Sequence, residues 1–243
     1  MKNTVLAVAA TLALTALPTV SHAEDSPLSF NVSLTSDYRY RGISQSRLKP
    51  ALQGGVDYAL PGGFYVGAWA STIKWIKDVG GDAGVEIDVY GGYKGEIVKD
   101  LNYDVGVLTY QYPSNKLGVN ANTTELYGAL SFGPATVKYS HAVTNTFGNF
   151  DSKNSFFLEA GAAFEVGGGV TVAPHVGYQR IKGPFSTVGS YTDYSLTASM
   201  DLSGFVVSAG VVGTDADKAF YVSPVGNKEL GKAGLVLAVK KTF

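Results

Sequence analysis

The 243-residue sequence contains no cysteine, so no disulfide can stabilise its fold. Beyond residue 23 it also has no apolar run approaching the about 20 residues that a membrane-spanning helix needs. An excess of one charge is missing too: 19 basic and 20 acidic residues give a net charge of −1, which lends no support to nucleic-acid binding. If the mature chain spans a membrane, a closed β-barrel is the remaining architecture, because backbone polar groups in lipid must all be paired.

Residues 1–23 have the features of a secretory signal peptide. Lys2 is their only charged residue, an apolar run covers residues 5–20, and small residues end the segment at Ala23. A membrane anchor is the alternative, but the apolar core is short for a spanning helix. We expect cleavage after Ala23. The mature chain, residues 24–243, is then one domain with 18 basic and 20 acidic residues, since only one lysine is removed.

Apolar and polar residues alternate along most of the mature chain, which indicates β-strands. The first segment places Leu28, Phe30 and Val32 on one face and Ser29 and Asn31 on the other. The same period predicts about twelve strands. Their expected ranges are 28–39, 50–59, 64–73, 83–94, 101–112, 123–132, 135–144, 154–166, 170–181, 191–202, 204–214 and 232–243.

The links between these segments alternate in length. Short Gly- and Pro-containing links fall at 60–63, 133–134, 167–169 and 203–204, and a slightly longer one at 95–100. Longer polar links separate the resulting pairs of segments. Short turns at one rim and long loops at the other are typical of outer-membrane barrels. We therefore expect an all-β, up-and-down antiparallel transmembrane barrel of about twelve strands, with both termini on the periplasmic side.

A soluble β-sandwich would show the same alternation, so two further observations decide between the classes. The expected strands are about ten to twelve residues long, whereas soluble strands average five or six. Aromatic residues also gather near the strand ends on the apolar face, as in the interfacial girdles of membrane barrels. These aromatics are Tyr38, Tyr58, Phe64, Tyr93, Tyr103, Phe132, Phe164, Tyr178 and Phe243.

The last segment ends on an aromatic residue, Phe243, after the alternating Leu235, Leu237 and Val239. Outer-membrane barrels commonly end on such a strand, and the barrel-assembly machinery recognises it. Lys241 departs from the pattern, although a lysine near the interface can extend its ammonium to the headgroups. We interpret Phe243 as an assembly signal, with the assembly machinery and outer-membrane lipids as partners.

Three segments of the N-terminal third resemble one family. They are Ser36-Asp37-Tyr38-Arg39-Tyr40-Arg41-Gly42-Ile43-Ser44-Gln45-Ser46, Pro50-Ala51-Leu52-Gln53-Gly54-Gly55-Val56-Asp57-Tyr58 and Gly63-Phe64-Tyr65-Val66-Gly67-Ala68-Trp69-Ala70-Ser71. Together they are similar to the TorF-type porin family of proteobacterial outer-membrane proteins. The match is most specific over about residues 30–100. The resemblance implies an outer-membrane barrel with a channel role and supplies no substrate.

The candidate catalytic residues of the mature chain do not complete a known catalytic arrangement of membrane barrels. His141 lies on the apolar face, but no serine stands two residues beyond it, as an outer-membrane phospholipase would require. Asp215 and Asp217 share the last long loop without a histidine, which a barrel protease would need. His175 is on the polar face, and one histidine with scattered carboxylates has no metal-site spacing. We expect no enzyme activity, cofactor or metal.

The polar faces should line the lumen and carry an excess of acidic residues. Ten acidic residues fall on these faces against four basic ones. The basic ones are Arg39, Lys94, Lys138 and Lys240. We expect a pore lined by Asp37, Arg39, Asp57, Glu86, Asp88, Asp104, Glu125, Lys138, Glu159, Glu165, His175, Asp193 and Asp201. Because charged rings in a low-dielectric wall set ion preference, this excess predicts a preference for cations.

A second group of charges occupies the first long loop. Arg41, Arg47 and Lys49, together with Arg39, form a basic cluster. It could contact phosphates of lipopolysaccharide, fold inward to narrow the pore, or remain a solvated loop. The sequence as a whole predicts an outer-membrane channel for passive diffusion of ions and small hydrophilic solutes. The alternative is a closed structural barrel that binds partners through its extracellular loops.

Overall fold

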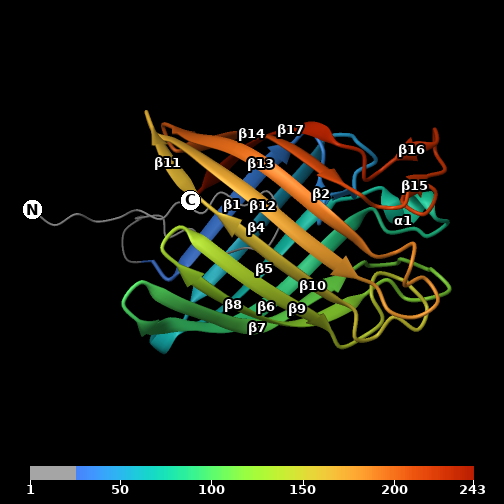
Figure 1. Cartoon of the computed structure of the whole chain (residues 1–243), viewed down its shortest axis with the longest axis horizontal. Coiled ribbons are helices and arrows are strands. Elements are labelled where there is room, and N and C mark those ends of the chain that lie inside the picture. The colour runs from blue at the N-terminus through green and yellow to red at the C-terminus, as the bar shows by residue number, and fades with distance from the viewer. Residues whose placement is uncertain (1–25) are drawn as a thin grey trace, which may run out of the picture.

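The computed structural model describes residues 26–243, and the expected signal peptide lies outside this range. The described chain forms a barrel of long antiparallel strands, with short turns at one rim and extended loops at the other (Figure 1). Among the described residues, no helix is long and apolar enough to cross a membrane. The helical segments are the one-turn α1, Trp75–Asp78, and the 3₁₀ turn η1, Pro61–Gly63.

The barrel wall is built from strands close to the ranges that the alternation predicts. They are β1 Leu28–Thr35, β4 Ala51–Ala59, β5 Phe64–Thr72, β6 Val85–Val98, β7 Leu101–Gln111, β8 Thr123–Phe132, β9 Ala135–Ala142, β10 Phe156–Ala162, β11 Phe164–Gly167, β12 Val170–Arg180, β13 Tyr191–Leu202, β14 Phe205–Thr214 and β17 Gly234–Thr242. Two short hairpins lie in the loops: β2 Arg39–Tyr40 with β3 Ile43–Ser44, and β15 Val222–Ser223 with β16 Lys228–Glu229.

The wall closes on itself with twelve strand positions. Thirteen strands join in one sheet, but β10 and β11 both pair with β12 and are separated only by Ala163, so they form one interrupted strand. First and last strands close the ring, with Leu34 opposite Val239. Every neighbouring pair is antiparallel, as an up-and-down barrel requires. The fold class predicted from the sequence is confirmed.

The interruption between β10 and β11 lies opposite Pro174. A proline cannot donate a ladder hydrogen bond, and the pairing of this wall stops at Gly161–His175 and resumes at Phe164–Val172. The register is the same on both sides of the gap. On its other side, β12 pairs with β13 continuously through Pro174. The proline therefore breaks one ladder without shifting the strands.

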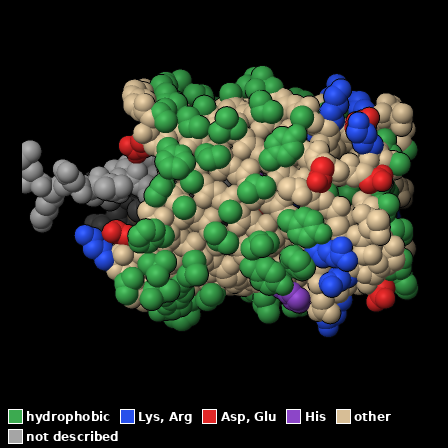
Figure 2. All heavy atoms as spheres, viewed as in Figure 1, with side chains coloured by type: hydrophobic (Ala, Val, Ile, Leu, Met, Phe, Trp, Pro, Cys, Tyr) green, Lys and Arg blue, Asp and Glu red, His purple; other side chains and the backbone are tan. Residues whose placement is uncertain are grey.

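Apolar side chains cover the outside of the barrel. Leu34, Leu126, Leu196 and Leu235 are 52%, 52%, 55% and 64% exposed, although each lies within a regular strand. In Figure 2 the hydrophobic side chains spread over the middle of the molecule, while charged side chains gather toward its ends. A soluble protein would bury such a surface, so this belt identifies a transmembrane barrel whose solvent is lipid.

The two rims differ as the link lengths predict. The turns after β4, β6, β8, β11 and β13 connect strands at one rim, and the longer loops lie at the other. Phe243 is at the short-turn rim, where its backbone exchanges hydrogen bonds of 3.1 and 2.8 Å with Phe30. Which side of the membrane this rim faces, and the role of Phe243 as an assembly signal, stay predictions.

The first strand is shorter than the alternation indicates. It ends at Thr35 rather than at residue 39, because the alternating Asp37, Tyr38 and Arg39 belong to a loop that turns into the barrel. The placement of Tyr38 in a lipid-facing girdle is therefore wrong. This ring is 1% exposed and its hydroxyl contacts Glu86 inside the barrel.

Candidate functional site

The first long loop, residues 36–50, folds into the barrel at its long-loop end. Within it, β2 and β3 pair Tyr40 with Ile43, which makes a tight hairpin with Arg41 and Gly42 at its tip. Both tip residues have positive φ, 46° for Arg41 and 78° for Gly42. A side-chain β-carbon at Gly42 would lie 2.4 Å from Thr214 Cγ2, so glycine allows the tip to press against the wall. We call residues 36–50 the inward loop.

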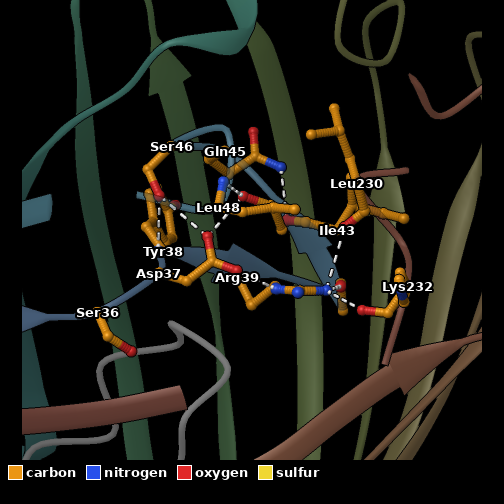
Figure 3. Close-up of polar contacts among 12 residues, drawn as sticks. Ser36, Asp37, Tyr38, Arg39, Ile43, Gln45, Ser46, Leu48, Leu230 and Lys232 are labelled. Atoms are coloured by element: carbon orange, nitrogen blue, oxygen red, sulfur yellow. Dashed lines mark hydrogen bonds and ion pairs between the residues drawn. The ribbon is translucent and has the colours of Figure 1, made fainter. Parts of the chain in front are cut away.

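A compact polar network holds the inward loop in shape (Figure 3). Asp37 pairs with Arg39, and its other carboxylate oxygen accepts bonds from Ser44 and Ser46 at 2.5 and 3.0 Å. Arg39 Nη1 also donates to the carbonyl oxygens of Leu230 and Lys232 at 3.1 and 3.0 Å. Buried charges persist only when paired and hydrogen-bonded, and this pair is both.

The base of the inward loop is also tied to other long loops. Gln45 O accepts bonds from Lys74 N and Trp75 N, at 2.8 and 3.2 Å, at the start of α1. Arg47 pairs with the buried Asp78, with Nε 2.9 Å from Oδ2, and this hydrogen bond raises the pKa of the guanidinium. These contacts do not involve the hairpin tip, so the loop backbone is held independently of the side chains that enter the lumen.

Arg41 reaches from the hairpin tip across the lumen. Its Nη1 and Nη2 donate to Glu125 Oε1 and Oε2 at 3.0 and 2.7 Å, and Nη1 also donates to Gln179 Oε1 at 2.5 Å. The guanidinium carbon is 4.8 and 4.3 Å from the ring centroids of Tyr40 and Phe157. Arg41 is 4% exposed. One side chain of the loop thus connects β8, β10 and β12.

Two tyrosines of the inward loop make further contacts with the wall. Tyr38 donates to Glu86 on β6 at 2.5 Å, and Tyr40 donates to Tyr110 on β7 at 2.7 Å. Tyr110 in turn donates to Glu125 at 3.2 Å. The loop is therefore bonded to four wall strands, which makes it a constriction in the long-loop half of the lumen.

Beside this constriction, β6 carries two carboxylates, Glu86 and Asp88. Within residues 26–243, neither forms an ion pair with a basic side chain. Glu86 is 1% exposed and accepts the bond from Tyr38 described above. Asp88 is 3% exposed, and within residues 26–243 its Oδ1 has no hydrogen-bond partner. Further toward the short turns, Tyr90 donates to Asp57 at 2.5 Å and Tyr65 donates to Asp104 at 2.6 Å. This wall is acidic and aromatic.

The opposite wall holds a charge cluster around a histidine. His175 Nε2 is 3.1 Å from Glu159 Oε2, and its Nδ1 is 3.4 Å from Asp193 Oδ1. Lys138, which is 7% exposed, places its ammonium 4.3 Å from the ring centroid of Tyr127. A search of the described residues finds no group of three or more His, Cys, Asp or Glu side chains that could hold a metal ion.

The remaining predicted residues lie nearer the rims. Glu165 and Asp201 are exposed at the short-turn end, where Asp201 accepts a bond from Gly204 N at 2.8 Å. Lys49 is exposed at the other end, where the inward loop rejoins the wall. Of the basic cluster, Arg41 is the member bonded to side chains of the barrel wall. Arg39 and Arg47 are bound to carboxylates of the loops themselves.

The residues considered for catalysis have structural partners. His141 lies on the outer face, with its ring nitrogens 3.0 Å from Tyr139 Oη and 3.2 Å from Asn154 Oδ1. Asp215 accepts a bond from Thr192 N at 2.6 Å, and Asp217 accepts bonds from Ala219 N and Phe220 N. These carboxylates shape the last long loop.

Sequence reasoning missed the partners that complete the constriction. Gln179, Phe157 and Tyr110 all lie on predicted polar faces, but they carry no charge, so the pattern of charged residues does not include them. The signal that could have found the loop is Tyr40-Arg41-Gly42. Glycine supplies the positive φ that a tight hairpin turn needs, so Gly42 indicates a turn directly after Arg41.

Residues 21–243 match a family described as "Bacterial protein of unknown function (Gcw_chp)". The chain belongs to this family. A search of curated proteins finds no match to the sequence.

Among solved structures, the fold is similar to two porins. The structure titled "KdgM porin in complex with disordered oligogalacturonate" has a TM-score of 0.53 at 8% identity, covering 89% of this chain and 98% of that one. The NanC porin has a TM-score of 0.54 at 9% identity, with the same coverage of both chains. At this identity the likeness shows the fold: a β-barrel of the outer-membrane porin type.

Proposed function

We propose that this Gcw_chp protein is an outer-membrane channel for passive diffusion of ions and small hydrophilic solutes, without enzyme activity. The observation that carries the proposal is the division of the barrel into an apolar outer belt and a charged, hydrogen-bonding lumen. The similarity to porin folds and the resemblance to TorF-type porins support it. The inward loop then acts as the constriction that limits flux.

We further propose that the channel prefers cations. Arg39, Arg41 and Arg47 are each neutralised by a carboxylate, so the basic cluster adds no uncompensated charge to the constriction. Glu86 and Asp88, in contrast, have no basic partner among the described ion pairs. In a narrow pore with low-dielectric walls, such carboxylates attract cations over a Debye length of about 8 Å at physiological salt.

Current through planar bilayers under a KCl gradient tests both parts. The purified protein, folded as judged by its heat-modifiable migration in gels, should conduct ions. Its reversal potential should have the sign of cation preference. The double variant Glu86→Gln/Asp88→Asn should lose part of that preference, because it removes the two uncompensated carboxylates. High salt should reduce the preference in the wild type by screening.

Asp82→Asn supplies the matched control. Asp82 lies in a long loop, and the Lys116 hydrogen bond lowers the pKa of this exposed carboxyl. Its neutralisation should leave the reversal potential unchanged. An anion-selective wild type would contradict the preference, and an equal effect of the two variants would contradict its assignment to the lumen wall.

The many bonds across the lumen favour one other function, a closed barrel that binds partners or lipopolysaccharide through its loops. Arg41 is buried rather than displayed, which leaves Lys49 as the exposed member of the basic cluster. The same bilayer recording separates the two functions. Folded protein that carries no current would support the closed barrel.

A further inference from the structure

We propose that the pocket around Arg41 is a lumen binding site for the guanidinium group of a permeating solute, which the chain's own arginine occupies in the closed constriction. The proposal rests on the channel function above and names its substrate class. The pocket consists of Glu125, Gln179 and the rings of Tyr40 and Phe157.

The pocket has the chemistry that recognises guanidinium. Both carboxylate oxygens of Glu125 accept from the two terminal nitrogens, at 3.0 and 2.7 Å, which is the two-point fork that a planar guanidinium makes. The Tyr40 and Phe157 ring centroids lie 4.8 and 4.3 Å from its carbon. An ammonium group is compact, and it neither makes the planar fork nor stacks as a plane. The site therefore favours guanidinium over ammonium.

Two buried carboxylate oxygens near the pocket have no hydrogen-bond partner among the described residues. Asp193 Oδ2, in the wall against which Gly42 packs, is a buried oxygen without a partner among the described residues. Asp88 Oδ1 is another, and Asp88 is the strand neighbour of Tyr110, which donates to Glu125. Unpartnered buried carboxylate oxygens are costly, and a second cation entering the lumen would relieve that cost.

The pocket should persist when the Arg41 side chain leaves it. The loop backbone is bound at Gln45 to the start of α1, and Ser44 N donates to Leu230 O at 3.0 Å. Arg39 and Asp37 hold the hairpin from within. None of these contacts uses Arg41, so truncation of its side chain should leave a guanidinium-sized polar void that small solutes can enter.

The test is chemical rescue of Arg41→Ala by guanidinium. We expect this variant to conduct more than the wild type in planar bilayers. Guanidinium chloride on the order of 10 mM, far below the molar range in which it unfolds proteins, should then block the current. Urea, which has a similar shape and no charge, should not block it. Arginine should block at lower concentration than lysine.

The double variant Arg41→Ala/Glu125→Gln is the matched control, because it leaves the same void without the carboxylate. The guanidinium concentration for half block should be at least about tenfold higher in the double variant than in Arg41→Ala. Equal block of the two variants, or equal effects of guanidinium and urea, would overturn the proposal.

A second readout covers poor folding of Arg41→Ala, in which the buried Glu125 keeps its bond from Tyr110 but loses its basic partner. In detergent, guanidinium at the same concentration should raise the refolding yield and thermal midpoint of this variant, relative to matched sodium chloride, but not those of the double variant. Equal responses would overturn the binding site. If neither the wild type nor the variant carries current, the proposed channel function is wrong. The refolding yield and thermal midpoint then decide whether the guanidinium site exists.

Discussion

At the scale of residues, the constriction depends on a few close contacts. Gly42 brings the hairpin tip within reach of β13 and β14, and Arg41 beside it connects three strands across the lumen. Most charged side chains at this depth contact an opposite charge or a hydroxyl, which offsets the free-energy cost of burying them. Asp88 Oδ1 and Asp193 Oδ2 are exceptions, since neither has a hydrogen-bond partner among residues 26–243.

Replacement of Gly42 by alanine should destabilise the barrel more than the same change at Gly62. Both glycines have φ of 78°, so alanine incurs similar backbone strain of about 1–2 kcal/mol at each position. Only at Gly42 would the new methyl overlap neighbours, while nothing lies within 4 Å at Gly62. Overpacking of this kind costs about 1–3 kcal/mol more. Thermal unfolding of the heat-modifiable form measures the difference, and equal midpoints would argue against tight docking of the tip.

At the scale of elements, alternation alone predicts the strands of the barrel wall with ends within about four residues of those observed. The segments expected at 123–132 and 191–202 coincide with β8 and β13. The period is informative here because lipid selects one face of each strand and the lumen selects the other. The same alternation gives a wrong strand end at residues 36–39, where it continues into the inward loop. These loop residues are buried inside the barrel, so their polar and apolar side chains alternate as they would in a strand.

The orientation of the barrel is a prediction at this scale as well. We expect the long loops to face outside the cell and the short turns to face the periplasm. The chain has no native cysteine, so Lys153→Cys in a long loop and Ser203→Cys in a short turn are clean probes. A membrane-impermeant maleimide on intact cells should label the first and not the second. The reverse pattern would invert the topology.

At the scale of the whole molecule, the sequence predicted which side chains share the lumen but not how they pair. Strand parity places Glu86, Glu125 and Asp193 on polar faces, and all three are buried inside the barrel. Their partners depend on the barrel's curvature and on a loop that crosses it. Glu125 and Gln179 both bond to Arg41, although they are 84 and 138 residues away from it in the sequence. Sequence spacing carries no information about such contacts.

We propose that side chains of the inward loop, rather than the barrel wall, limit flux through the molecule. The most direct measurement is single-channel conductance of the wild type against Tyr40→Ala/Arg41→Ala, which truncates two of the loop side chains that bond to the wall. Arg47→Ala is the matched control, because Arg47 belongs to the same loop but binds Asp78 at its base. We predict a conductance at least about twofold higher in the double variant and nearly unchanged in the control. Equal conductance in all three proteins would contradict the account.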